Sequence, residues 1–264
     1  MESKSSKDLL GDGMFAAYTL PTLRRTVVTS DGAYLDTLRL GAEPGRGVII
    51  CHGFGGNKNI LNLVALAQDL ADLYTVYTFD FRGHGLSPGR STFGYLEVND
   101  LRAVVDLARE DGNLKLAVIG FSMGGVALLR YAAQFGGLDA VIAVSVPADV
   151  RSSRAPGARL IRFIVGNPIG RAYGSRRFGV KIDKISKHAD PPASLVHRVA
   201  PQPLTIIHGE DDFVFEPEQA RELQRRAGGN CRLKIFQDYI HAEGGYGPRF
   251  LEYVLEVLEE DLGS

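Results

Sequence analysis

Only two cysteines, Cys51 and Cys231, occur among the 264 residues. Two cysteines are too few for a framework of disulfides, and we expect both to be small apolar core residues in a reducing compartment. No run of about 18 apolar residues is present, so no transmembrane helix is expected. The first residues, MESKSSKDLLGDGM, are polar where a signal peptide needs an apolar stretch. We therefore expect a polar leader at residues 1–21 and a cytoplasmic location.

An excess of either charge is also missing, because 30 Lys and Arg oppose 31 Asp and Glu to give a net charge of −1. This balance argues against a protein that binds nucleic acid through its overall charge. The two cysteines and six histidines do not fall at the short spacings of zinc ligands, so we expect no metal and no cofactor. With 45% hydrophobic residues the chain can bury a full core, and a single domain over residues 1–264 is the simplest expectation.

Short apolar runs alternate with segments of helical spacing along most of the chain. Residues 24–30 and 34–40 indicate a hairpin around the turn Asp31-Gly32. After it, continuous apolar strands separated by amphipathic helices indicate a parallel sheet that is covered on both faces. The expected fold class is α/β, with a mostly parallel sheet of eight strands and an insertion at about 148–200. The later strands are expected at 47–51, 74–79, 114–119, 140–146, 203–207 and 232–236, and the helices at 57–71, 98–109, 123–135, 217–226 and 249–262.

The strongest local feature is the motif Gly-Phe-Ser-Met-Gly at residues 120–124, between an expected strand and an expected helix. A sharp strand-to-helix turn needs small residues on both sides of the serine, and it lifts the Ser122 hydroxyl clear of the sheet. The N–H groups at the start of the following helix point at the same place. Ser122 is therefore the candidate nucleophile, and the alternative is a glycine-rich turn that serves only packing.

A serine hydroxyl becomes a good nucleophile when a base removes its proton. Of the six histidines, only His241 lies in the loop between the last strand and the last helix, at the edge where parallel sheets carry reactive groups. The acid that orients this base should lie between the serine and the histidine in the chain. Asp212, after the strand at 203–207, is the first candidate, with Asp211 beside it and Asp149 one strand earlier as rivals. The alternative for the Asp pair is a solvated turn that caps the next helix.

Acyl transfer also needs N–H donors for the oxyanion of the tetrahedral intermediate. The turn His-Gly-Phe-Gly-Gly at 52–56 ends a strand and offers accessible backbone amides, so we expect the N–H groups of Phe54 and Met123 to be the pair. A phosphate cradle is the alternative for such a turn, but neither G-K-[ST] nor G-x-G-x-x-G occurs here. The tight loop at 80–87 (DFRGHGLS) is interpreted as structural, with Arg82 and His84 hydrogen-bonded near the site.

With these residues placed, the chain resembles the α/β-hydrolase superfamily, in particular its esterase, lipase and serine-aminopeptidase-like members. The resemblance covers roughly residues 24–147 and 200–262, and its blocks agree in order and spacing. The chain departs from the family pattern at Phe213, where a proline usually follows the acid, and in the glycine-rich loop after His241. The matching blocks are HGFGG at 52–56, DFRGHGLS at 80–87, GFSMGG at 120–125, HGEDD at 208–212, and His241.

The resemblance implies an α/β-hydrolase sheet with Ser122 as nucleophile, His241 as base, Asp212 as acid, and Phe54 and Met123 as oxyanion donors. The expected function is a carboxylesterase-like serine hydrolase that forms an acyl-enzyme and needs no cofactor. The alternatives on the same triad are a lysophospholipase or monoacylglycerol lipase, a peptidase, and an acyltransferase. A binding or receptor protein with slow turnover is an alternative of another class, because a fold does not determine a function.

In this superfamily the insertion at about 148–200 usually forms a cap over the active site. Its charge here is unusual, because residues 151–200 hold eleven Lys and Arg against two Asp, a net charge of +9. One interpretation is a solvated amphipathic cap. The other is attraction of an anionic or lipid-like ester, or of an anionic lipid surface, with Arg176 and Arg177 as candidate contacts. The basic residues are Arg151, Arg154, Arg159, Arg162, Arg171, Arg176, Arg177, Lys181, Lys184, Lys187 and Arg198.

Overall fold

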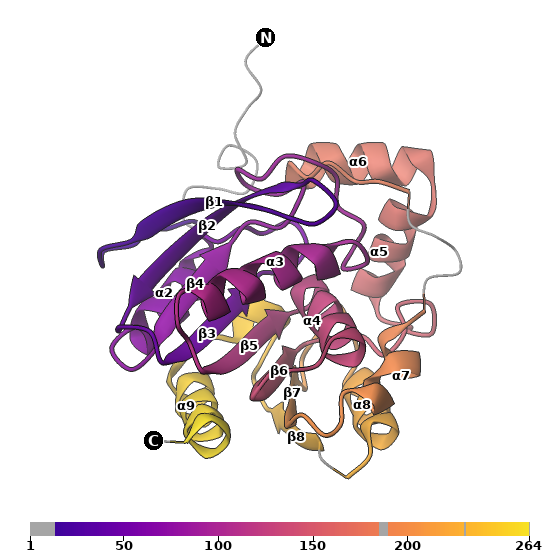
Figure 1. Cartoon of the computed structure of the whole chain (residues 1–264). Helices are drawn as coiled ribbons and strands as arrows, with labels where there is room; N and C mark the ends of the chain where they lie inside the picture. The colour runs from indigo at the N-terminus through magenta and orange to yellow at the C-terminus, as the bar shows by residue number, and fades with distance from the viewer. Residues whose placement is uncertain (1–13, 185–189, 230, 264) are drawn as a thin grey trace.

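The computed structural model describes residues 14–184, 190–229 and 231–263. Residues 1–13 of the expected leader, and Lys187 and His188 of the insertion, lie outside the described residues. The eight strands form one sheet in the spatial order β1-β2-β4-β3-β5-β6-β7-β8 (Figure 1). They are β1 (Leu23–Val28), β2 (Tyr34–Gly41), β3 (Arg46–Cys51), β4 (Thr75–Phe79), β5 (Lys115–Phe121), β6 (Ala140–Val144), β7 (Leu204–Gly209) and β8 (Cys231–Phe236).

The direction of the strands follows the sequence pattern. β1 and β2 form an antiparallel hairpin in which Val28 pairs with Tyr34, and β2 is also antiparallel to β4. The neighbours from β4 across to β8 are parallel. The predicted α/β class with a mostly parallel sheet of eight strands is therefore confirmed. Because parallel strands end at one edge of the sheet, the loops that follow β3, β5, β7 and β8 meet there.

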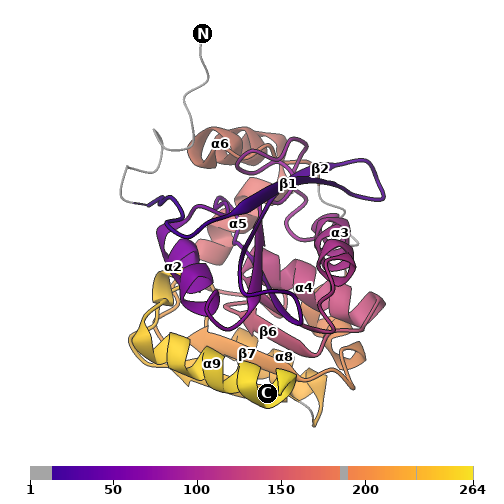
Figure 2. The ribbon, with the colours of Figure 1, turned by 60° about the vertical axis from the view of Figure 1, so that its left-hand side comes forward.

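Helices cover both faces of this sheet, as Figures 1 and 2 show. Helices α2 and α9 pack on one face, while α3, α4, α7 and α8 pack on the other. Within the described ranges, no helix is both long enough and apolar enough to cross a membrane. The helices are α2 (Leu61–Leu70), α3 (Glu97–Glu110), α4 (Met123–Gln134), α7 (Pro192–Leu195), α8 (Glu218–Ala227) and α9 (Pro248–Leu262).

Side chains of the central strands alternate between the two cores. Val118 of β5 joins the core under α3 and α4, whereas the next residue, Ile119, joins the core under α2 and α9. A strand that is covered on both faces has no polar side, which explains the continuous apolar runs in the sequence. Cys51 is fully buried in the first of these cores, and Cys231 is half-buried beside it.

Helix α2 begins at Leu61, four residues later than the predicted segment 57–71. The residues before it are held in another way, because Lys58 is buried and bound to Asp80 of the following loop. Its N–H donates to one Asp80 carboxylate oxygen (2.8 Å) and its Nζ to the other (2.7 Å). Phe15 also forms a bridge with Ile60, so part of the expected leader lies against this segment. These contacts hold residues 58–60 in a turn and a β-bridge, so the helix begins only at Leu61.

Two helices occupy the middle of the insertion, where the sequence shows no clear period: α5 (Pro156–Gly166) and α6 (Pro168–Phe178). Both begin with a proline, whose fixed φ suits the first helical turn. The Asn167 side chain caps α6 by accepting a hydrogen bond from the Gly170 N–H (2.8 Å). The buried residues of α6 are the glycines Gly170 and Gly174, so this helix lacks the apolar stripe that predicts a helix.

Candidate active site

Ser122 lies in the tight turn where β5 ends at Phe121 and α4 begins at Met123. Its φ of 47° and ψ of −111° form a strained backbone conformation for a residue that has a Cβ. The Ser122 N–H donates to the Val144 carbonyl (2.8 Å), and the Ser122 carbonyl accepts from the Val126 N–H (3.0 Å). These hydrogen bonds hold the strained turn that the motif at 120–124 indicates.

The glycines of the motif allow three backbone segments to approach closely. A Cβ on Gly120 would lie 2.8 Å from the Gly124 carbonyl oxygen, and a Cβ on Gly124 would lie 2.6 Å from the Cys51 carbonyl oxygen. Both distances are shorter than any normal contact of a Cβ atom, so these positions exclude larger residues. The close approach places Ser122 directly beside the loop that follows β3.

His241 connects Ser122 to Asp212. The Nε2 atom of His241 lies 2.9 Å from Ser122 Oγ, and its Nδ1 atom lies 2.8 Å from Asp212 Oδ2. The three residues come from the loops after β5, β7 and β8, so the structure brings together side chains that are far apart in the chain. When the Nδ1–H group donates a hydrogen bond to the carboxylate, the lone pair of Nε2 faces the serine hydroxyl.

The Asp212 carboxylate is buried and fully hydrogen-bonded. Its Oδ1 atom accepts hydrogen bonds from the N–H groups of Val214 (2.8 Å) and Phe215 (2.9 Å), while Oδ2 faces His241. Burial acts to raise the pKa of Asp212, but the hydrogen bonds from His241 and from Phe215 outweigh it and hold that pKa below its usual range. The carboxylate is therefore ionised at neutral pH and can accept a hydrogen bond from the His241 Nδ1–H.

The two rival carboxylates lie elsewhere. The Asp211 side chain is exposed to solvent, and the Asp149 carboxylate accepts hydrogen bonds from the Arg151 guanidinium (2.9 Å). Of the three candidate acids, the structure brings only Asp212 to His241. Phe213, which replaces the usual proline, is 62% exposed, so its side chain does not occupy the space between the acid and the base.

Three residues that the sequence analysis did not single out hold the His241 loop in place. The Ala242 N–H donates to Ser145 Oγ (3.0 Å), and the Tyr239 hydroxyl donates to the Ala242 carbonyl (2.8 Å). The Phe215 ring contacts the His241 imidazole edge-on, with 5.5 Å between ring centroids. Isolated Ser, Tyr and Phe residues in loops carry no sequence signal of such a role, since their partners are distant in the chain.

The two predicted oxyanion donors both belong to segments that lie next to Ser122. Met123 follows Ser122 directly, and Phe54 follows Gly53, whose ideal Cβ position lies 3.5 Å from the Ser122 Cβ. As the first residue of α4, Met123 has an N–H without a partner inside the helix. Within the described parts of the chain, neither the Phe54 N–H nor the Met123 N–H donates to a protein acceptor. Both amides are free to bind an oxyanion.

The loop at 80–87 is hydrogen-bonded to the loop at 52–56. His52 is fully buried, and its Nε2 atom accepts a hydrogen bond from the Phe81 N–H (3.0 Å). The Arg82 guanidinium donates to the buried Asp100 carboxylate (2.8 Å), and His84 Nδ1 lies 3.1 Å from the Arg82 carbonyl oxygen. These contacts join Arg82 and His84 to the framework around the site rather than to the serine.

A further carboxyl group, that of Glu243, faces the site. Its Oε1 atom accepts a hydrogen bond from the Gly53 N–H (2.6 Å), and both of its oxygens lie 3.3 Å from the ideal Cβ position of Gly53. Burial raises the pKa of Glu243. Glu243 lies two positions after His241. Only the glycines of this loop are conspicuous in the sequence, so no local pattern indicates the position of Glu243. Glu243 thus ties the loop of His241 to the loop at 52–56.

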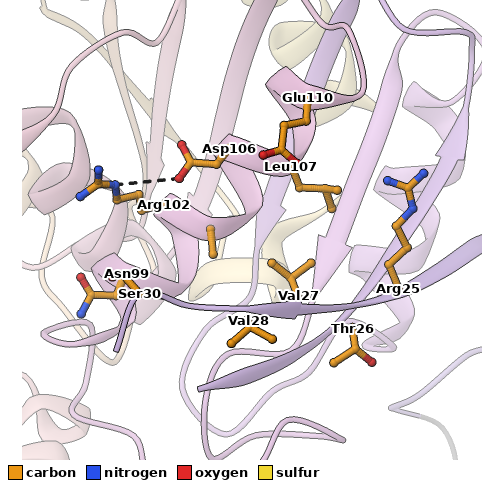
Figure 3. A pocket seen from close by; sticks show the side chains of 11 residues that line it. Arg25, Thr26, Val27, Val28, Ser30, Asn99, Arg102, Asp106, Leu107 and Glu110 are labelled. Atoms are coloured by element: carbon orange, nitrogen blue, oxygen red, sulfur yellow. Dashed lines mark ion pairs between the residues drawn. The ribbon is translucent and has the colours of Figure 1, made fainter. Parts of the chain in front are cut away.

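Two hollows are present in the described surface. The first, here the α4–α5 cavity, has a volume of about 760 Å³ and lies between α4, α5 and the start of α6. Phe93 and Val126 line this cavity, and Val126 lies one turn of α4 beyond Ser122. Ser122 itself does not line it. The second, of about 430 Å³, lies between β1 and α3 around Arg25 and Asp106 (Figure 3). Because β1 is the edge strand, four places from β5, the second hollow is remote from the serine.

The basic insertion reaches the site through α6. Arg176 and Arg177 are exposed on the last turn of α6, and neither lines the α4–α5 cavity. The Phe178 ring beside them contacts the Phe54 ring, with 5.7 Å between centroids. Among the residues with described positions, no group of three or more His, Cys, Asp or Glu side chains is arranged to hold a metal ion.

Comparison with known proteins adds a family and several relatives. A model of a family described as "Alpha/beta hydrolase family" matches residues 48–246. A monoacylglycerol lipase of Mycolicibacterium smegmatis is 27% identical over 237 residues, covering 75% of this chain and 82% of the lipase. An esterase of Pyrococcus furiosus aligns with a TM-score of 0.75 at 21% identity, over 100% of this chain and 98% of the esterase. An esterase of a Rhodococcus species aligns with a TM-score of 0.67 at 19% identity, over 90% and 99% of the two chains.

Proposed function

Because this chain belongs to the alpha/beta hydrolase family, we propose that it is a serine hydrolase that cleaves carboxylic esters through an acyl-enzyme. The observation that carries the proposal is the unbroken row of hydrogen bonds from Ser122 through His241 to Asp212, at 2.9 and 2.8 Å. Relatives named as a lipase and as esterases support an ester as the substrate.

The reaction proceeds in two halves. Ser122 Oγ attacks the ester carbonyl while His241 Nε2 accepts the hydroxyl proton, and the Asp212 carboxylate stabilises the resulting imidazolium. His241 then returns that proton to the leaving oxygen, the carbonyl–oxygen bond breaks, and the alcohol departs. Water attacks the acyl group with His241 again as base, which releases the carboxylic acid and restores Ser122.

The charge that develops on the carbonyl oxygen needs donors that are already in place. The N–H groups of Phe54 and Met123 supply them, and each such donor is worth roughly 10²–10³ in kcat. Glu243 holds the neighbouring Gly53 N–H by a hydrogen bond (2.6 Å), and its burial raises the pKa of its carboxyl group. Glu243 serves here as a positioning residue, because it acts on the Gly53 N–H.

The helices α5 and α6 form the cap in this proposal. A small apolar cluster joins them to the oxyanion loop, because Ile164, Val180 and Ile182 are buried together and contact Phe54. The buried members of this cluster belong to neither core of the sheet, and Phe54 and Val165 connect it to the core under α3 and α4. The helix pair can therefore set the shape of the substrate site without any change in the sheet.

A monoacylglycerol lipase or lysophospholipase is the second candidate, and the α4–α5 cavity is the observation that favours it. Apolar side chains of Phe93, Val126, Ile161 and Val165 line this cavity, which suits the apolar chain of a lipid-like ester. A peptidase and a receptor with slow turnover would use the same three residues and are separated by the test below. An acyltransferase would also use them, and it would transfer the acyl group to an added alcohol in preference to water.

The test is turnover of p-nitrophenyl esters, thioesters, acylglycerols and aminoacyl amides by the purified protein. We expect many turnovers with esters and a loss of roughly 10⁴–10⁶ in kcat for Ser122→Ala. The control is Ser30→Ala, at an exposed position after β1, which is expected to keep full activity. Full activity in Ser122→Ala, little more than one turnover, or a preference for amides over esters would refute the proposal.

A further inference from the structure

The α4–α5 cavity extends along α4, away from the candidate nucleophile. Val126 and Arg130 line it from the same face of the helix, since they are four residues apart. At a rise of 1.5 Å per residue, Arg130 lies about 12 Å beyond Ser122 along the helix axis. Ile161 and Val165 line the cavity from α5. The cavity thus spans the stretch of α4 from Val126, one turn beyond Ser122, to Arg130.

Among the residues with described positions, the buried cation Arg130 has no carboxylate partner within ion-pair distance. It is 6% exposed, its Nη2 donates to the Asp190 backbone carbonyl, and its guanidinium carbon lies 4.4 Å from the centroid of the Tyr95 ring. Its buried Nε has no acceptor among the residues that the structure describes. Burial lowers the pKa of Arg130, and the electrostatic effects of Tyr95, Asp190 and Glu97 oppose this shift only in part.

The surroundings of Arg130 are positive as well. Five cationic side chains line the α4–α5 cavity against two carboxylates, and one of these carboxylates, that of Asp149, is already paired with Arg151 (2.9 Å). A buried cation without a counter-ion destabilises a fold unless an anion binds to it. The cavity therefore combines apolar side chains with an excess of positive charge, and along α4 the apolar Val126 lies closer to Ser122 than Arg130 does. The cationic residues are Arg130, Arg151, Arg162, Arg171 and Lys184.

We propose that this cavity binds an ester whose apolar chain carries an anionic group, and that Arg130 binds that group. The proposal rests on ester hydrolysis at Ser122. The apolar side chains around Val126 cover the chain, and the guanidinium of Arg130 donates its free N–H groups to a carboxylate or phosphate. Arg130 is a specificity-determining residue in this arrangement, because it lies about two turns of helix from the reacting carbonyl.

Two pairs of esters with equal chain lengths separate the effect of the anionic group from the effect of the apolar chain. Mono-p-nitrophenyl suberate and p-nitrophenyl octanoate differ by a terminal carboxylate on the acyl side, whereas ω-acetoxyoctanoate and octyl acetate differ by one on the alcohol side. A hydrogen bond to a charged group corresponds to a change of roughly 10- to 100-fold. We expect Arg130→Met to lower the anionic-to-neutral ratio of kcat/KM by that factor in one pair, and the responding pair identifies the side that carries the anion.

Two further variants separate recognition from packing. Arg130→Lys keeps the charge and is expected to retain part of the preference for the anionic ester. Arg102→Met is the matched control, because the Arg102 guanidinium also lies over an aromatic ring, that of Phe135 (4.6 Å), but does not line the cavity. Equal losses on both members of each pair, with a lower melting temperature for Arg130→Met, would show that Arg130 only supports the cavity wall and would overturn the proposal.

A binding measurement distinguishes failure of this proposal from failure of ester hydrolysis. Calorimetric titration of the Ser122→Ala protein is expected to show octanoate binding at least tenfold more tightly than octanamide, with the difference lost in Ser122→Ala/Arg130→Met. If esters turn over but neither the ratios nor octanoate binding depends on Arg130, the anion site is wrong and the hydrolase stands. If octanoate binds through Arg130 but no ester turns over, the anion site stands and the hydrolase is wrong.

Discussion

Replacing Asp212 by Asn tests how the proton position on His241 is set. The backbone N–H groups of Val214 and Phe215 both donate to Asp212 Oδ1, at 2.8 and 2.9 Å, so the amide oxygen of an Asn would take that place. Its NH₂ group would then donate to His241 Nδ1. The ring proton of His241 would move to Nε2, which could no longer accept the proton of Ser122.

The size of the loss follows from the cost of turning the amide over. The turned amide would place NH₂ against two N–H donors and leave both without an acceptor, at roughly 1–3 kcal/mol each. Together these make about 2–6 kcal/mol, and about 1.4 kcal/mol corresponds to a factor of ten. The active tautomer is therefore expected to be rarer by roughly 30- to 10⁴-fold in Asp212→Asn, with an equal loss in kcat.

The assay is single-turnover and steady-state hydrolysis of a p-nitrophenyl ester, beside thermal unfolding to confirm that each variant folds. Asp149→Asn and Asp211→Asn are the controls, because Asp149 is paired with Arg151 and Asp211 is exposed, so both are expected to keep near wild-type kcat. A large loss in Asp149→Asn with little change in Asp212→Asn would refute the reasoning.

Three other perturbations have defined outcomes. Gly124→Ala places a Cβ 2.6 Å from a backbone oxygen and is expected to cost roughly 1–3 kcal/mol in urea unfolding, and unchanged stability would contradict this account of the turn. Burial lowers the pKa of His52 and His208 below the unfolded value of about 6.5, so only the unfolded chain gains these protons as the pH falls. The free energy of unfolding should thus decrease below about pH 6.5, by up to roughly 3 kcal/mol per pH unit, and a flat profile down to about pH 5.5 would refute neutral buried histidines. If the basic insertion steers anionic esters, raising the salt from about 0.1 to 1 M shortens the Debye length from about 10 to 3 Å and should lower kcat/KM more for an anionic than for a neutral ester. Arg176→Glu with Arg177→Glu should shrink that difference, whereas equal salt dependence of the two esters would show a merely solvated face.

The fold was predictable because its strands are covered on both faces. Short continuous apolar runs such as residues 47–51, separated by segments of helical spacing, are typical of strands covered on both faces, and the turn Asp31-Gly32 marks the hairpin. The limits of the elements were less predictable. The start of α2 depends on the bond between Lys58 and Asp80, and such a contact between distant residues leaves no local pattern.

The candidate site, like the fold, was predictable from the sequence only in part. Ser122 carries a local signal, since a strained strand-to-helix turn needs glycines around it, and chain order pointed to His241 and Asp212. The position of Glu243 against Gly53 depends on how two loops meet, which a sequence does not show. Arg130 had a weak signal, as a single charge in the otherwise apolar helix GGVALLRYAA, but its burial becomes visible only when α5 lies beside α4.

Covalent labelling of the protein by a fluorophosphonate tests the central claim most directly, because the reagent reacts with a serine that a neighbouring base activates. Intact mass and peptide mapping should find one adduct per chain, on Ser122, and none in Ser122→Ala. Asp212→Asn should label more slowly by about the factor lost in its kcat. An adduct on another serine, or ester hydrolysis by a protein in which Ser122 is never labelled, would contradict the account.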